Sequence, residues 1–159
     1  MAKAIRLSER GGPEVLKWQQ VEVADPQADE VLLRQTAVGV NFADVYLRTG
    51  LYPQPLPSGI GSEAAGVVAA VGRKVRGIKP GDHMVYSLPL PGAYAEQRVL
   101  AADKLLKIPS GISDEQAAAS LIRRKLVRVH IGQRYPLAQA AQAQRDLESR
   151  RTIGSTVLP

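Results

Sequence analysis

The stretch SDEQAAASLIRRKLVRVHIG, residues 113–132, begins with the pattern of a helix and ends with that of a strand. Ser113 and Gln116 have the spacing of a capping box, in which each side chain bonds a free amide at the helix start. From Val127 to Ile131, apolar residues alternate with polar ones, which is typical of a half-buried strand. No Gly, Pro, Asn or Asp lies between Ala117 and Ile131 to turn the chain. The helix pattern therefore runs directly into the strand pattern, which raises the question of whether a segment is missing between them.

The composition indicates a globular domain. The chain has 159 residues, of which 45% are hydrophobic and 23% charged, and this length suits one domain with a real core. It contains no run of the roughly 18 apolar residues that cross a bilayer. Its N-terminus lacks the apolar region of a signal peptide. We therefore expect a cytoplasmic protein that has no membrane partner.

The sequence contains few residues that could bind a metal ion or act as a thiol. It has no cysteine, which excludes disulfides and thiolate sites, and its two histidines are His83 and His130. Zinc sites usually take three or four ligands from Cys, His and carboxylates. We expect no metal, and each histidine is most simply a strand residue.

The positive charge is concentrated near the C-terminus. The net charge is +6, and residues 112–159 hold eight basic residues against four acidic ones. A nucleic-acid site would also bring stacking aromatic residues or a recognisable module, but this region has only Tyr135. A solvated basic face is the better interpretation, and we expect no nucleic-acid partner.

Short strands separated by Gly and Pro turns dominate the chain. The pattern predicts strands over 3–7, 15–23 and 31–40, and further short strands follow residue 62. Helices are predicted over 41–50 and after Pro136. Because the strands do not alternate with helices, a barrel or sandwich is favoured. The expected fold class is mainly β with a few helices (α+β).

One glycine motif resembles a nucleotide-binding sequence. Residues Gly59 to Ala64 fit the permissive dinucleotide pattern G-x-G-x-x-G/A. That pattern must follow a buried strand and open a helix, whereas here it follows the proline-rich YPQPLPS. We predict that these glycines only allow a tight entry into a strand.

The candidate binding residues lie in GVNFADVYLRTGLYP. Asn41, Asp44, Tyr46 and Tyr52 place an amide, a carboxylate and two phenols around one short helix and the following loop. Such groups can line a pocket for a planar polar ligand, since the rings supply flat walls and the amide and hydroxyls donate hydrogen bonds. From the local sequence, Asn41 can equally be only an N-cap and Tyr46 only a core residue.

Six motifs, in order and spacing, resemble one known family: GGPEVL, GVNFADVYLRTGLYP, GIGSEAAGVVAAVG, IKPGDHMVY, GAYAEQ and EQAAAS. They are similar to the first domain of the medium-chain dehydrogenase/reductase superfamily, most closely its zinc-independent, zeta-crystallin-like NADPH:quinone oxidoreductases. The sequence after Lys125 resembles the family's C-terminal segment. The resemblance implies a GroES-like, partly open β-barrel without the Rossmann domain that the family carries between these segments. Residues 1–159 would form a single catalytic domain from segments 1–120 and 121–159.

The resemblance also implies a function. Zinc-dependent relatives have a Cys where Asn41 stands and a His where Ser62 stands, so the metal ligands are missing here. The activity implied is transfer of reducing equivalents from NADPH to a quinone, with Asn41, Tyr46 and Tyr52 as catalytic residues and Asn41, Asp44 and Tyr46 as cofactor-binding residues. Because the nucleotide domain has no counterpart, we expect weak or absent NADPH binding and strongly impaired turnover.

A different class of function stays open. The chain could be a non-enzymatic GroES-like module for binding or assembly. The surface that faces the nucleotide domain in the family would then be exposed and partly apolar, which favours self-association.

Overall fold

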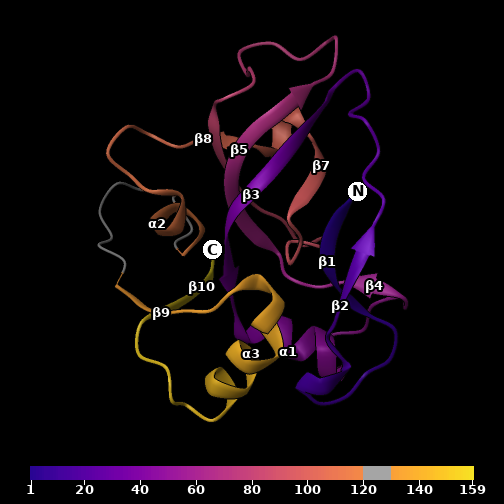
Figure 1. The fold of residues 1–159 in the computed structure, drawn as a ribbon, viewed down its shortest axis with the longest axis vertical. Helices are drawn as coiled ribbons and strands as arrows, with labels where there is room; N and C mark the ends of the chain where they lie inside the picture. The colour runs from indigo at the N-terminus through magenta and orange to yellow at the C-terminus, as the bar shows by residue number, and fades with distance from the viewer. Residues whose placement is uncertain (120–129) are drawn as a thin grey trace.

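The computed structural model describes residues 1–119 and 130–159 (Figure 1). The strands are β1 (Ala2–Leu7), β2 (Lys17–Val21), β3 (Glu30–Val40), β4 (Ser58–Gly59), β5 (Glu63–Val71), β6 (His83–Ser87), β7 (Gln97–Ala101), β8 (Leu106–Lys107), β9 (Ile131–Arg134) and β10 (Ser155–Leu158). The helices are α1 (Phe42–Thr49), α2 (Asp114–Ala118) and α3 (Ala140–Glu148), with short 3-10 turns η1 (Pro13–Val15), η2 (Ala102–Lys104) and η3 (Leu137–Gln139). The expected fold class, mainly β with a few helices, is confirmed.

The strands form two sheets that meet at one point. The smaller sheet has the order β2-β1-β4, and the larger has β8-β6-β5-β3-β10-β9, with β7 also paired to β3. A bridge between Ala4 and Ala95 joins them, and the Ile5 N–H donates to the carbonyl of Tyr94 at 2.8 Å. The sheets are not closed into a complete barrel, in agreement with the partly open barrel that was expected.

The C-terminal segment lies inside the larger sheet. β10 pairs antiparallel with β3, where Thr156 lies opposite Val40, and it pairs parallel with β9 on its other side. α3 lies against α1 and η1 (Figure 1). Val157 and Leu158 of β10 are almost fully buried, and Leu158 belongs to the larger apolar cluster. Residues 130–159 therefore pair with β3 and pack against the helices of residues 1–119.

Two apolar clusters stabilise the domain through burial of apolar surface. The larger contains Leu33, Val38 and Tyr86 and receives Ala140 and Ala143 of α3. The smaller lies on the opposite face of the larger sheet, where α2 packs, and its members are Ala37, Ala65, Val85, Ile108, Ala117 and Ala118. Figure 1 shows α2 on one side of β3 and β5, with β1 and β2 on the other.

The local sequence signals are largely confirmed. The Gln116 N–H donates to Ser113 Oγ at 3.2 Å and the Ser113 N–H to Gln116 Oε1 at 3.0 Å, which completes the capping box of α2. Gly50 ends α1 with a φ of 87°, a left-handed conformation that favours glycine. The helix predicted after Pro136 begins as η3 and continues as α3.

Two further expectations concern the glycine motif and the junction. The Gly59 to Ala64 motif leads into β5 and not into a helix, as predicted. The expected strand residues Val127 and Val129, together with the junction near Ser120, lie outside the described residues.

Candidate functional site

Asn41 connects the end of β3 to the start of α1. It stands at the N-cap position, and its backbone N–H donates to Asp44 Oδ2 at 2.9 Å. Its side-chain Nδ2 donates to Oε1 of Glu63, the first residue of β5, at 2.8 Å. Gly39 makes this contact possible, because a Cβ at that position would overlap Glu63 Oε1 and lie 2.6 Å from the Ala118 carbonyl. The Asn41 amide is therefore fixed by a carboxylate from the neighbouring strand.

Asp44 points into the protein beneath α1. It has no exposed surface, and burial raises the pKa of its carboxyl to about 7. The Tyr94 hydroxyl donates to Oδ2 at 3.0 Å, whereas Oδ1 has no hydrogen-bond partner among residues 1–119 and 130–159. Burial also raises the pKa of Glu63 above its ordinary value. Two carboxyl groups that resist ionisation thus lie on either side of Asn41.

A buried polar network joins α1 to α3. Arg48 is fully buried, and its Nε donates to Gln144 Oε1 at 2.7 Å, while an Nη contacts Glu148 at the same distance. A further Nη donates to the carbonyl of Gly11. A buried guanidinium is tolerated only when its donors are satisfied. The network therefore ties the helix that carries Asn41 to the C-terminal segment.

Three aromatic rings form an exposed patch on α1 and the loop after it. Tyr46 and Tyr52 meet edge to face, with ring centroids 5.3 Å apart, and Phe42 lies 6.5 Å from Tyr46. Phe42 is 46% exposed and Tyr52 is 50% exposed. We call Phe42, Tyr46 and Tyr52 the aromatic patch. It is an accessible aromatic surface on the helix that begins beside Asn41 and on the loop after that helix.

The structure places the predicted site residues in two groups. Asn41, Tyr46 and Tyr52 reach the surface in whole or in part, whereas Asp44 lies below it. Sequence reasoning missed Glu63, although a carboxylate at the start of a strand of small apolar residues was a signal for it. It also missed Tyr94, whose contact with Asp44 spans 50 residues of sequence.

The described residues offer little to a metal or a dinucleotide phosphate. No group of three or more His, Asp or Glu in residues 1–119 and 130–159 is arranged to hold a metal ion. Among those residues, α1 is the only α-helix that directly follows a strand, and the buried Asp44 carboxyl occupies its first turn and accepts the Asn41 N–H. The phosphates of NADPH therefore do not fit the residues present. No helix in this part of the chain is long and apolar enough to cross a bilayer.

Comparison with known sequences gives a consistent set of relatives. Residues 27–110 match the family described as "Alcohol dehydrogenase GroES-like domain". The quinone oxidoreductase of Pseudomonas aeruginosa is 47% identical over 138 residues, which are 86% of this chain and 42% of that protein. Quinone oxidoreductase 1 of Escherichia coli is 48% identical over 124 residues, 77% of this chain and 38% of that protein. The chain thus spans about two fifths of the length of these relatives.

Solved structures agree with the sequence relatives. The Escherichia coli quinone oxidoreductase complexed with NADPH matches with a TM-score of 0.73 and 40% identity, over 89% of this chain and 50% of that one. A mycobacterial quinone oxidoreductase matches with a TM-score of 0.88 over 99% of both chains, and at 21% identity it supports the fold alone. Since residues 27–110 make up more than half of the sequence, the chain belongs to the alcohol dehydrogenase GroES-like domain family and is a homologue of the quinone oxidoreductases.

Proposed function

We propose that this chain is the substrate-binding catalytic domain of a quinone oxidoreductase, in which Asn41, Tyr46 and Tyr52 form the quinone site. The proposal rests on the position of the Asn41 side-chain amide. It is held by a hydrogen bond to Glu63 at the N-terminus of α1, the helix that carries most of the aromatic patch. A quinone is flat and carries two carbonyl oxygens, so it suits aromatic walls with nearby donors. The sequence similarity to quinone oxidoreductases includes this region.

Each polar group has a distinct role in this proposal. Asn41 uses one Nδ2 hydrogen on Glu63 and keeps a second hydrogen for a quinone oxygen. The hydroxyls of Tyr46 and Tyr52 have no hydrogen-bond partner in the described part of the chain and can donate to the ligand. Donors held in place before reduction stabilise the negative charge that develops on a quinone oxygen.

The cofactor side of the site is incomplete. Asn41, Asp44 and Tyr46 are the residues proposed to face the nicotinamide of NADPH, the source of reducing equivalents. Asp44 has no exposed surface, so it would act by holding the Asn41 backbone and not by touching the cofactor. Because the described residues do not form a binding site for the phosphates of NADPH, we infer weak or absent NADPH binding and strongly reduced turnover.

We also propose that segments 1–120 and 121–159 form one domain, joined where relatives carry their nucleotide domain. Contacts between the segments support this arrangement. Ser155 Oγ donates to the Ala119 carbonyl at 3.3 Å, and β10 occupies an inner position in the larger sheet.

Quinone binding can be tested by NMR titration with duroquinone. We expect shifts at Asn41, Tyr46 and Tyr52, and a loss of affinity of roughly tenfold for Asn41→Ala. Tyr135→Phe is the matched control, since its hydroxyl bonds Asp146 on the C-terminal segment. Unchanged affinity in Asn41→Ala, or shifts confined to other surfaces, would reject the site. Micromolar affinity for NADPH in calorimetry, or turnover comparable to full-length relatives, would reject the inferred impairment.

A non-enzymatic module that self-associates is the second candidate, and exposed apolar side chains near α1 favour it. Leu51 is 66% exposed beside the aromatic patch. Sedimentation at several protein concentrations tests this candidate. Concentration-dependent association that Leu51→Ser abolishes, without any quinone binding, would support it over the enzyme domain.

A further inference from the structure

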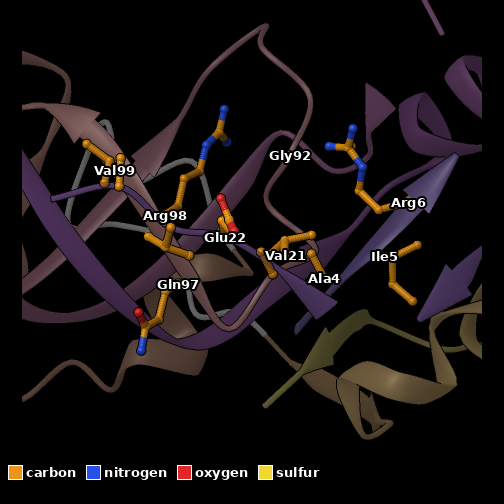
Figure 2. A pocket seen from close by; sticks show the side chains of 13 residues that line it. Ala4, Ile5, Arg6, Val21, Glu22, Gly92, Gln97, Arg98 and Val99 are labelled. Carbon is orange, nitrogen blue, oxygen red and sulfur yellow. The ribbon is translucent and has the colours of Figure 1, made fainter. Parts of the chain in front are cut away.

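A pocket of about 270 Å³ lies between β1, the residues after β2, and β7 (Figure 2). None of its lining residues belongs to α1 or the aromatic patch. Two arginines, Arg6 and Arg98, line it together with one acid, Glu22. Its apolar wall consists of small side chains: Ala4, Val21, Val23, Ala24, Ala95 and Val99.

Two glycines, Gly59 and Gly92, line the pocket together with the arginines. Arg6 on β1 lies opposite Gly59 on β4. A Cβ built on Gly59 would lie 2.7 Å from the Cα of Gly92, and one built on Gly92 would lie 3.5 Å from Arg98 Cζ. Figure 2 shows both guanidinium groups extending in the same direction, with Gly92 between them. A side chain at Gly59 would clash with the Gly92 backbone, and one at Gly92 would come into contact with the Arg98 guanidinium.

Neither guanidinium is neutralised by a carboxylate in the described part of the chain. Arg6 makes no hydrogen bond or ion pair there. Arg98 donates to the Leu90 carbonyl at 3.1 Å and the Tyr86 hydroxyl at 3.2 Å, and its Cζ lies 5.2 Å from the centre of the Tyr86 ring. These contacts hold Arg98 in place and leave its charge uncompensated. Glu22 forms no ion pair with either arginine, so the lining carries a net positive charge.

We propose that this pocket binds a small planar organic anion, with its carboxylate between Arg6 and Arg98 and its ring against the valine wall. Guanidinium groups bind carboxylates through paired, charge-assisted hydrogen bonds, which suits them to this task. Pockets for drug-sized ligands begin at roughly 300 Å³. The smaller volume here fits a one-ring molecule such as benzoate.

The test is an NMR titration of the full chain with benzoate and with benzamide, which has nearly the same shape and no charge. We expect benzoate to shift the amides of Arg6, Gly92 and Arg98, and benzamide to bind roughly tenfold more weakly. Arg6→Gln should weaken benzoate binding by about the same factor. Glu22→Gln should strengthen it, because an opposing charge is removed.

Arg73→Gln is the matched control, since Arg73 is exposed, lies outside the pocket and makes no contact that this substitution would remove. Equal affinity for benzoate and benzamide would overturn the proposal, as would wild-type affinity in Arg6→Gln. Shifts at Tyr46 and Tyr52 instead of the pocket would also overturn it. If Arg6→Gln does not fold, the affinities of the wild-type chain for benzoate and benzamide still test the proposal. This outcome is independent of quinone binding.

Discussion

Glu115 on α2 and Arg134 on β9 form a two-armed ion pair. Arg134 Nη2 lies 2.6 Å from Glu115 Oε2, and Arg134 Nε lies 3.0 Å from each carboxylate oxygen. The two residues stand on either side of residues 120–129, so their contact joins the N-terminal and C-terminal segments.

Removing this ion pair should have a small effect on stability. The Arg134 side chain is 53% exposed, and exposed pairs contribute little because solvent screens them. We expect Glu115→Gln, Arg134→Gln and the double variant to lose at most a few degrees of Tm, with the double variant close to either single one. Thermal unfolding of the wild type and the three variants at low and high salt measures these differences in Tm. A collapse of the fold in any one variant would contradict it.

The same pair gives a pH dependence of known sign. The hydrogen bond from Arg134 lowers the pKa of Glu115 in the folded protein. Its contribution is therefore present at neutral pH and is lost as the pH falls through the folded-state pKa. The difference between wild type and Glu115→Gln should vanish under acidic conditions.

Asp44 should give a dependence of the opposite sign. Burial raises its pKa to about 7, so between pH of about 4 and about 7 the folded state binds more protons than the unfolded state. Stability should fall as the pH rises through this window, and Asp44→Asn should flatten the fall. Urea unfolding from pH 5 to pH 8 measures both slopes. An unchanged slope in Asp44→Asn would show that Glu63 or another group carries the effect.

Local sequence patterns predicted those parts of the site that depend on neighbouring residues. The strand that ends at Val40, the helix that follows, and its end at Gly50 were all recognisable. The sequence did not predict that Asp44 points inward, because its partner Tyr94 lies in the loop between β6 and β7. Arg48 likewise resembles an ordinary helix-end cation until Gln144, 96 residues away, is placed beside it. Contacts between distant segments require the tertiary structure.

Gly39 should be intolerant of even one methyl group. A Cβ there would overlap Glu63 Oε1 and lie 2.6 Å from the backbone oxygen of Ala118, which cannot easily move. We expect Gly39→Ala to cost roughly 1–3 kcal/mol and to disturb the Asn41 side-chain amide signal. Gly12→Ala is the control, since the atoms nearest its new Cβ belong to the exposed end of the Glu14 side chain, which can move. Equal stability of the two variants would contradict the packing argument.

Arg48 should be the most sensitive residue of the network between α1 and α3. It is fully buried, and its loss leaves Gln144 and the Gly11 carbonyl without their donors, while Glu148 loses its partner. Each buried polar group left without its partner typically costs roughly 1–3 kcal/mol, so we expect Arg48→Ala to lower the urea midpoint strongly.

The matched control for Arg48 is Arg145→Ala, on the exposed face of α3, whose side chain donates to Gln142 Oε1 over a long 3.3 Å. We expect this variant to unfold at nearly the wild-type urea concentration. Arg48→Lys separates charge from geometry, because an ammonium keeps the charge but lacks the planar fork that reaches three acceptors. A lysine variant as stable as wild type would show that charge alone holds α1 against the C-terminal segment.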